Sequence, residues 1–160
     1  MHRTPLALIL ASLAAPTSLA QLQVVERVSV SSTGAESTKG AGSLLDMSKD
    51  GRYVAFISQS SGLAAGDTNS TFDVFRHDRE TGTTILCSGD ATGTTGWLPS
   101  TDPSISADGR YVAFVTENAL IASDTNGEHD VYLFDAQAGT VELVSVDAGG
   151  GPADERSLGP

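Results

Sequence analysis

Two short segments rich in aspartate and asparagine carry the side-chain oxygens that could do chemistry in this chain. In Asp124–Asp130 these oxygens stand at the first, third and seventh positions, and Gly127 lies between them. Oxygen ligands, with a glycine that allows a sharp turn, suit a hard cation such as Ca²⁺. The sequence predicts calcium loops whose ligands are Asp124, Asn126 and Asp130 in one segment and Asp67, Asn69 and Asp73 in the other.

A turn that holds no metal explains the same residues. The pattern lacks the twelve-residue frame and the terminal glutamate of a full calcium loop. Asp and Asn side chains also bind their own main chain in turns. The turn is the preferred interpretation, with no cofactor, and calcium stays the alternative. If calcium binds, we expect the second segment to bind it better, because Ser70 stands in the first segment where the second has Gly127.

Other catalytic patterns are missing from the sequence. It contains no Gly-x-Ser-x-Gly nucleophile elbow and no Gly-x-x-x-x-Gly-Lys-Ser/Thr phosphate loop. His77 and His129 do not form a metal-ligand pair by their spacing. Cys87 is the one cysteine, so we expect a small buried residue rather than a disulfide. Trp97 is expected to pack between structural units. These observations favour a protein that is not an enzyme.

The two acidic segments recur because the chain contains an internal repeat. Ser48–Ile57 returns as Ser106–Val115, 58 residues later, and Asp73–Phe75 returns as Asp130–Tyr132, 57 residues later. The residue that is lost falls in a loop, as expected for a structural repeat. Each repeat is predicted to contain four short strands. In the second repeat we expect them over 103–106, 110–116, 130–135 and 140–146.

Four strands at a fixed period are typical of one blade of a β-propeller. The predicted fold is therefore all-β, with β-propeller-type four-stranded blades: two full repeats plus one lone N-terminal strand, which is an incomplete propeller. The lone strand is expected at Val24–Val30, which resembles Val141–Val146. The expected divisions are a signal peptide over 1–20, the lone strand and a linker over 21–42, blade 1 over 43–92, blade 2 over 93–148, and a linker to a missing blade over 149–160.

The repeat resembles the TolB-like and WD40-like β-propeller repeats of bacterial envelope and secreted proteins. The resemblance rests on Pro103–Phe114, Asp124–Gly127 and Asp130–Tyr132, whereas Leu45 and Ser70 depart from the pattern. It implies a binding or scaffolding segment that contacts a protein or glycan partner. The alternatives are an accessory propeller of a larger, prolyl-oligopeptidase-like hydrolase, and a calcium-stabilised structural repeat. Propellers have about 4–8 blades, so we expect a longer parent chain or a homo-oligomer.

The N-terminus predicts export. A basic start, Met1–Thr4, precedes an apolar run over Pro5–Pro16 and small residues in Ser18–Ala20. These are the three parts of a secretory signal peptide, and the run is shorter than the roughly 20 residues of a membrane span. We expect a periplasmic or secreted protein, cleaved near Ala20. After cleavage 8 basic and 20 acidic residues remain, which disfavours nucleic-acid binding.

Overall fold

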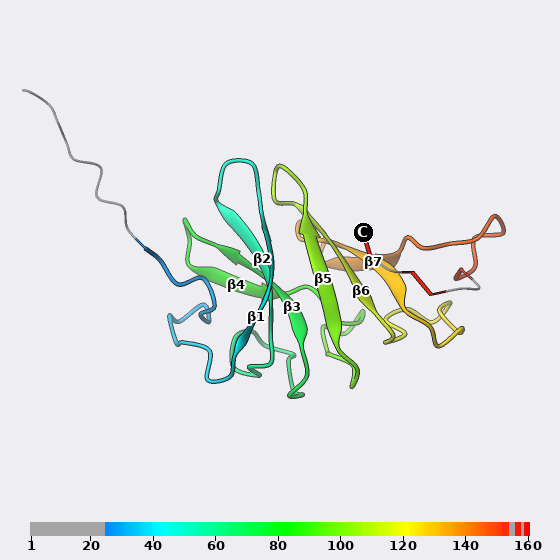
Figure 1. Cartoon of the computed structure of the whole chain (residues 1–160), viewed down its shortest axis with the longest axis horizontal. Coiled ribbons are helices and arrows are strands. Elements are labelled where there is room, and N and C mark those ends of the chain that lie inside the picture. The colour runs from blue at the N-terminus through cyan, green and yellow to red at the C-terminus, as the bar shows by residue number, and fades with distance from the viewer. Residues whose placement is uncertain (1–24, 154–155, 158) are drawn as a thin grey trace, which may run out of the picture.

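The structure, a computed structural model, describes residues 25–153, 156–157 and 159–160. The predicted signal peptide and its cleavage site therefore lie outside the described residues. The described chain forms two four-stranded antiparallel sheets that stand side by side (Figure 1). Within these residues no helix is long and apolar enough to cross a membrane.

Each sheet is one repeat, with its four strands in sequence order. Blade 1 consists of β1 (Ala41–Met47), β2 (Tyr53–Ser58), β3 (Asp73–Asp78) and β4 (Thr83–Leu86). Blade 2 consists of β5 (Ser100–Ile105), β6 (Tyr111–Thr116), β7 (Asp130–Asp135) and β8 (Thr140–Leu143). The prediction of an all-β fold with propeller-type four-stranded blades is confirmed.

Two strand boundaries differ by three residues from the sequence-based prediction. β5 begins at Ser100 rather than at 103, and its register with β6 is irregular between Thr101 and Ser104. Asp102 has a positive φ of 53° there, so the strand continues through a local bulge instead of starting after it. β8 ends at Leu143 rather than at Val146.

The lone N-terminal strand is not formed over residues 25–30, and Val24 lies outside the described residues. Val30 makes only an isolated bridge to Glu36. The segment instead meets the edge of blade 1 through side chains, because the Thr84 hydroxyl donates to the Val30 carbonyl and Ser32 binds both main-chain groups of Thr84. These contacts replace the continuous ladder that a strand needs.

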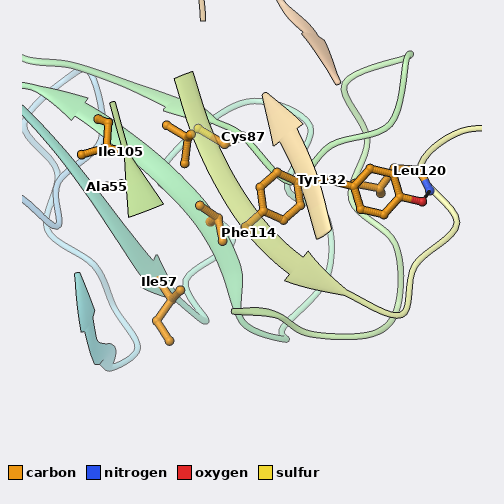
Figure 2. Packing of buried hydrophobic residues seen from close by; sticks show 9 residues of the cluster. Ala55, Ile57, Cys87, Ile105, Phe114, Leu120 and Tyr132 are labelled. Atoms are coloured by element: carbon orange, nitrogen blue, oxygen red, sulfur yellow. Dashed lines mark hydrogen bonds between the residues drawn. The ribbon is translucent and has the colours of Figure 1, made fainter. Parts of the chain in front are cut away.

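The main core lies between the two blades. Ala55 and Ile57 on β2 face Phe114 on β6 and Tyr132 on β7, and all four are buried (Figure 2). β5, the first strand of blade 2, lies against β1, β2 and β3 of blade 1 (Figure 1). Successive side chains of β2 point to opposite faces, so Phe56 packs on the far face of blade 1. The apolar pattern on both faces of β2 thus positions blade 2.

Two equivalent turn glycines test the contact between the blades. Gly51 and Gly109 both have positive φ, 74° and 72°. A Cβ on Gly51 would lie 3.7 Å from its nearest neighbour, the Met47 sulfur, whereas on Gly109 it would lie 2.0 Å from Cδ2 of Tyr53 in the other blade. Gly51→Ala should cost about 1–2 kcal/mol for the left-handed backbone alone.

Gly109→Ala should cost about 1–3 kcal/mol more, because the added methyl group overpacks the contact with Tyr53. Urea denaturation of the two variants and the parent measures the difference. Equal losses of unfolding free energy would show that the Gly109 turn does not pack closely on blade 1.

Candidate functional site

The long connections of both blades gather at one end of the sheets. The loops over 59–72 and 117–129 follow the second strand of each blade, and the linker over 87–99 runs between them (Figure 1). Asn69 of the first loop donates to the Gly96 carbonyl in this linker at 2.7 Å. The short turns lie at the other end, where the Lys49 amide donates to the Ala107 carbonyl at 3.0 Å. The two acidic segments therefore occupy matching positions, one per blade.

The asparagines of the predicted calcium loops are engaged in turns. Asn69 Oδ1 accepts from the amide two residues later at 2.7 Å, and Asn126 Oδ1 does the same at 3.0 Å. Their side-chain amides donate to the following linkers, at Gly96 (2.7 Å) and Ala153 (2.8 Å). Both asparagines thus act as local turn residues that fasten each loop to the next linker.

The last aspartate of each acidic segment, which begins the third strand of its blade, binds a serine on the neighbouring strand end. Ser88 donates to Asp73 Oδ1 at 3.0 Å and Ser145 donates to Asp130 Oδ1 at 2.6 Å. Each serine also accepts from the main-chain amide that follows the aspartate. Asp73 and Asp130 are only 1% and 0% exposed, and Oδ2 of each has no hydrogen-bond partner among the described residues.

The remaining aspartates differ between the two blades. The Tyr132 hydroxyl donates to Asp124 Oδ2. The same hydroxyl, beside Leu120 in Figure 2, accepts from the Leu120 amide at 3.2 Å. Blade 1 has Phe75 where blade 2 has Tyr132, and Oδ1 of Asp67 has no partner among the described residues. Burial, with a contribution from the Asp67 charge, raises the pKa of Asp73 to about 7.

The structure thus gives different roles to the aspartates and the asparagines among the six predicted ligands. It brings Asp67 and Asp73 into electrostatic reach of each other in blade 1, and it commits the asparagine oxygens to turns. No group of three or more His, Cys, Asp or Glu side chains within the described residues is arranged to hold a metal. A site built from carboxylates alone is therefore not present in the described chain, and any cation would also need carbonyl or water oxygens.

Matching arginines pair with the aspartates that end the third strands. Arg52 forms two bonds to Asp78, at 2.9 and 2.7 Å, and Arg110 forms two to Asp135, at 3.0 and 2.6 Å. Asp78 and Asp135 also accept turn amides. The guanidinium groups hold the pKa of both carboxyls well below its usual range. These four residues stabilise the turns.

The histidines and the cysteine occupy structural positions. His77 is buried and its Nδ1 lies 2.9 Å from the Thr84 hydroxyl, and burial lowers its pKa. Cys87 is fully buried, as expected, and burial raises the pKa of its thiol to about 12. A thiol in this state is a poor nucleophile. His129 pairs with Glu117 at 2.6 Å on the surface.

The prediction for Trp97 is wrong, because this side chain is 85% exposed. At the neighbouring Gly96 the linker runs close to the loop of blade 2, because a Cβ there would lie 2.1 Å from Asn118 Oδ1. Asn118 also binds both main-chain groups of Leu98, at 3.0 and 2.6 Å. Trp97 is thereby presented on a fixed linker, beside a hollow of about 320 Å³. Nothing in the sequence separates this arrangement from inter-blade packing.

The chain was compared with known families, curated proteins and solved structures. No family model matches it, and no curated protein matches it. One similar solved structure is TolB from Acinetobacter baumannii. The two chains are 20% identical, with a TM-score of 0.42 over 66% of this chain and 21% of that one. The matched region thus spans about a fifth of TolB's length.

The paired arginines predict how stability depends on pH. Asp78 and Asp135 have lowered folded-state pKa values, so below about pH 4 the unfolded state binds more protons than the folded state. Stability should therefore fall as the pH decreases from 5 to 2.5. In Asp78→Asn and Asp135→Asn this fall should be smaller, by a similar amount in each. Urea denaturation across this range is the measurement, and an unchanged slope in both variants would contradict the assignment.

Proposed function

We propose that this chain is a non-catalytic binding segment of an exported propeller-type protein, and that it binds through the faces of its blades. One observation supports the proposal: the outer face of blade 2 repeats part of the face with which blade 1 binds blade 2, with Ala113, Val115 and Val131 in place of Ala55, Ile57 and Val74. The two faces differ at the edge strand, where Glu142 stands in place of Ile85. The signal-like N-terminus supports export. The buried Cys87 and His77 support the absence of catalysis.

Equivalent residues show which face is free. Ala55 is fully buried against blade 2, whereas its equivalent Ala113 is only half-buried. Cys87 is 0% exposed, whereas its equivalent Val144 is 42% exposed. Because most positions of the outer face carry apolar side chains like those of the inner one, we infer that its partner is a further blade of this repeat. Apolar surface left in water costs roughly 25 cal/mol per Å².

Blade 1 offers the complementary surface. A hollow of about 740 Å³ lies over its far face, lined by residues that include Leu63, Ala64 and Leu86. The equivalent positions in blade 2 are Leu120, Ile121 and Leu143, which pack against blade 1. The outer face of blade 2 in one copy of the chain therefore fits this hollow in a second copy, head to tail.

Two charge substitutions test the docking, one on each face. Ala113→Glu lies on the outer face of blade 2, and Ala64→Glu lies in the hollow of blade 1. We expect the full parent chain to self-associate, and each variant to associate roughly 100-fold more weakly because a buried unpaired charge is costly. An equimolar mixture of the two variants should restore a one-to-one dimer, because one intact face of each kind remains. Sedimentation velocity at about 0.15 M salt, where repulsion between the acidic chains is screened, gives these states.

Ala138→Glu is the matched control, because Ala138 lies exposed on the β7–β8 turn and away from both faces. This variant should associate like the parent. A parent chain that stays monomeric at every concentration would overturn docking between copies. If Ala113→Glu and Ala64→Glu both associate as strongly as the parent, the contact between copies lies on other surfaces of the blades.

A further inference from the structure

The two blades differ at one buried position of their acidic loops. In blade 2 the Tyr132 hydroxyl donates to Asp124. In blade 1 the equivalent side chain is Phe75, which has no hydroxyl. The rings occupy matching places, because Phe75 stacks on Phe56 with centroids 5.7 Å apart and Tyr132 stacks on Phe114 with centroids 6.1 Å apart.

Blade 1 has two buried carboxylate oxygens without a hydrogen-bond donor, one more than blade 2, and the missing hydroxyl accounts for the difference. Oδ1 of Asp67 and Oδ2 of Asp73 have no hydrogen-bond partner among the described residues, although the two residues are only 7% and 1% exposed. A buried carboxylate oxygen without a hydrogen-bond donor is unfavourable. Blade 2 retains one such oxygen, Oδ2 of Asp130, because Tyr132 satisfies Asp124.

No ion pair within the described residues neutralises Asp67 or Asp73. Lys39 influences Asp67 electrostatically, but it lies exposed on the preceding linker and forms no ion pair with Asp67 within the described residues. A small hard cation would satisfy both free oxygens at once. Ca²⁺ suits such a place, because it accepts carboxylates together with main-chain carbonyls and water at flexible geometry.

We propose that blade 1 binds one Ca²⁺ ion between Asp67 and Asp73, and that the Tyr132 hydroxyl takes the place of such an ion in blade 2. The order of the two loops is the opposite of the one expected from Gly127 alone. Two carboxylates with free oxygens raise the affinity for Ca²⁺ more than a glycine that eases the turn, because the number of ligand charges tunes the affinity of calcium sites. The inference concerns the loop end of the blades and is independent of docking through their faces.

Exchanging one hydroxyl between the blades tests the proposal. The full chain, stripped with EDTA, is titrated with CaCl₂ at pH 8 by calorimetry, and its thermal midpoint is followed with and without Ca²⁺. The parent should bind one Ca²⁺ per chain, with a dissociation constant of about 0.1–1 mM as in extracellular modules. Phe75→Tyr should bind roughly tenfold or more weakly, because the new hydroxyl donates to Asp67.

The reciprocal variant should create a second site. Tyr132→Phe frees the Asp124 oxygen beside Asp130, so the stoichiometry should rise to two. The double variant Phe75→Tyr, Tyr132→Phe should return it to one. Asp67→Asn removes a ligand charge without changing side-chain size and should abolish the Ca²⁺-dependent rise in midpoint.

Folding of the key variant is checked in EDTA, where Phe75→Tyr should melt at or above the parent's midpoint because Asp67 gains a donor. A parent that neither binds nor is stabilised by Ca²⁺ would overturn the proposal. So would Phe75→Tyr binding Ca²⁺ as tightly as the parent, or Asp67→Asn retaining the full rise in midpoint.

Discussion

The structure depends on the face-to-face burial of blade 1 against blade 2. A four-stranded antiparallel sheet that is apolar on both faces is not satisfied by its own hydrogen bonds, because each face still needs cover. Ala55 and Ile57 from one blade close over Phe114 and Tyr132 from the other. This contact fixes the spacing of the sheets, and with it the path of the linker and the end at which the long loops meet.

The polar residues hold the loops and turns rather than the core. Arg52 and Arg110 each form an ion pair with an aspartate at the end of a third strand. Asn69 and Asn126 fasten each long loop to the linker that follows. Because these bonds recur at equal offsets in both repeats, the two blades have nearly the same frame. Differences between them then stand out as local chemistry on a common scaffold, and the exchange of Phe75 for Tyr132 is the clearest case.

The two blades also differ in what covers them. The inner face of blade 1 meets blade 2, while the equivalent face of blade 2 leaves Val144 exposed. In such a repeat, each blade binds the next through two different faces. The first and the last blade therefore each leave one face uncovered, and these two faces are of opposite kinds. The molecule's uncovered apolar surfaces therefore follow from the arrangement of its repeats.

The sequence by itself determined the blades. The recurrence of Ser48–Ile57 as Ser106–Val115, with alternating apolar residues and Asp-Gly turns, specified four strands per repeat and placed the acidic loops at matching positions. Local chemistry suffices there, because strand period and turn conformation depend on neighbouring residues. The bulge at Asp102 and the missing strand before Val30 escaped prediction, since both depend on which edge lies nearby.

Only the tertiary structure decided what the singled-out side chains do. It placed Trp97 on the surface and the neighbouring Gly96 beside Asn118, a contact between residues distant in sequence. It separated the asparagines, which are used in turns, from the aspartates, whose free oxygens lie buried. It also showed that one ring hydroxyl, eight residues from Asp124 in the chain, satisfies that carboxylate in blade 2. The sequence spacing of ligands says which oxygens are available, but burial and neighbouring donors decide which of them still need a partner.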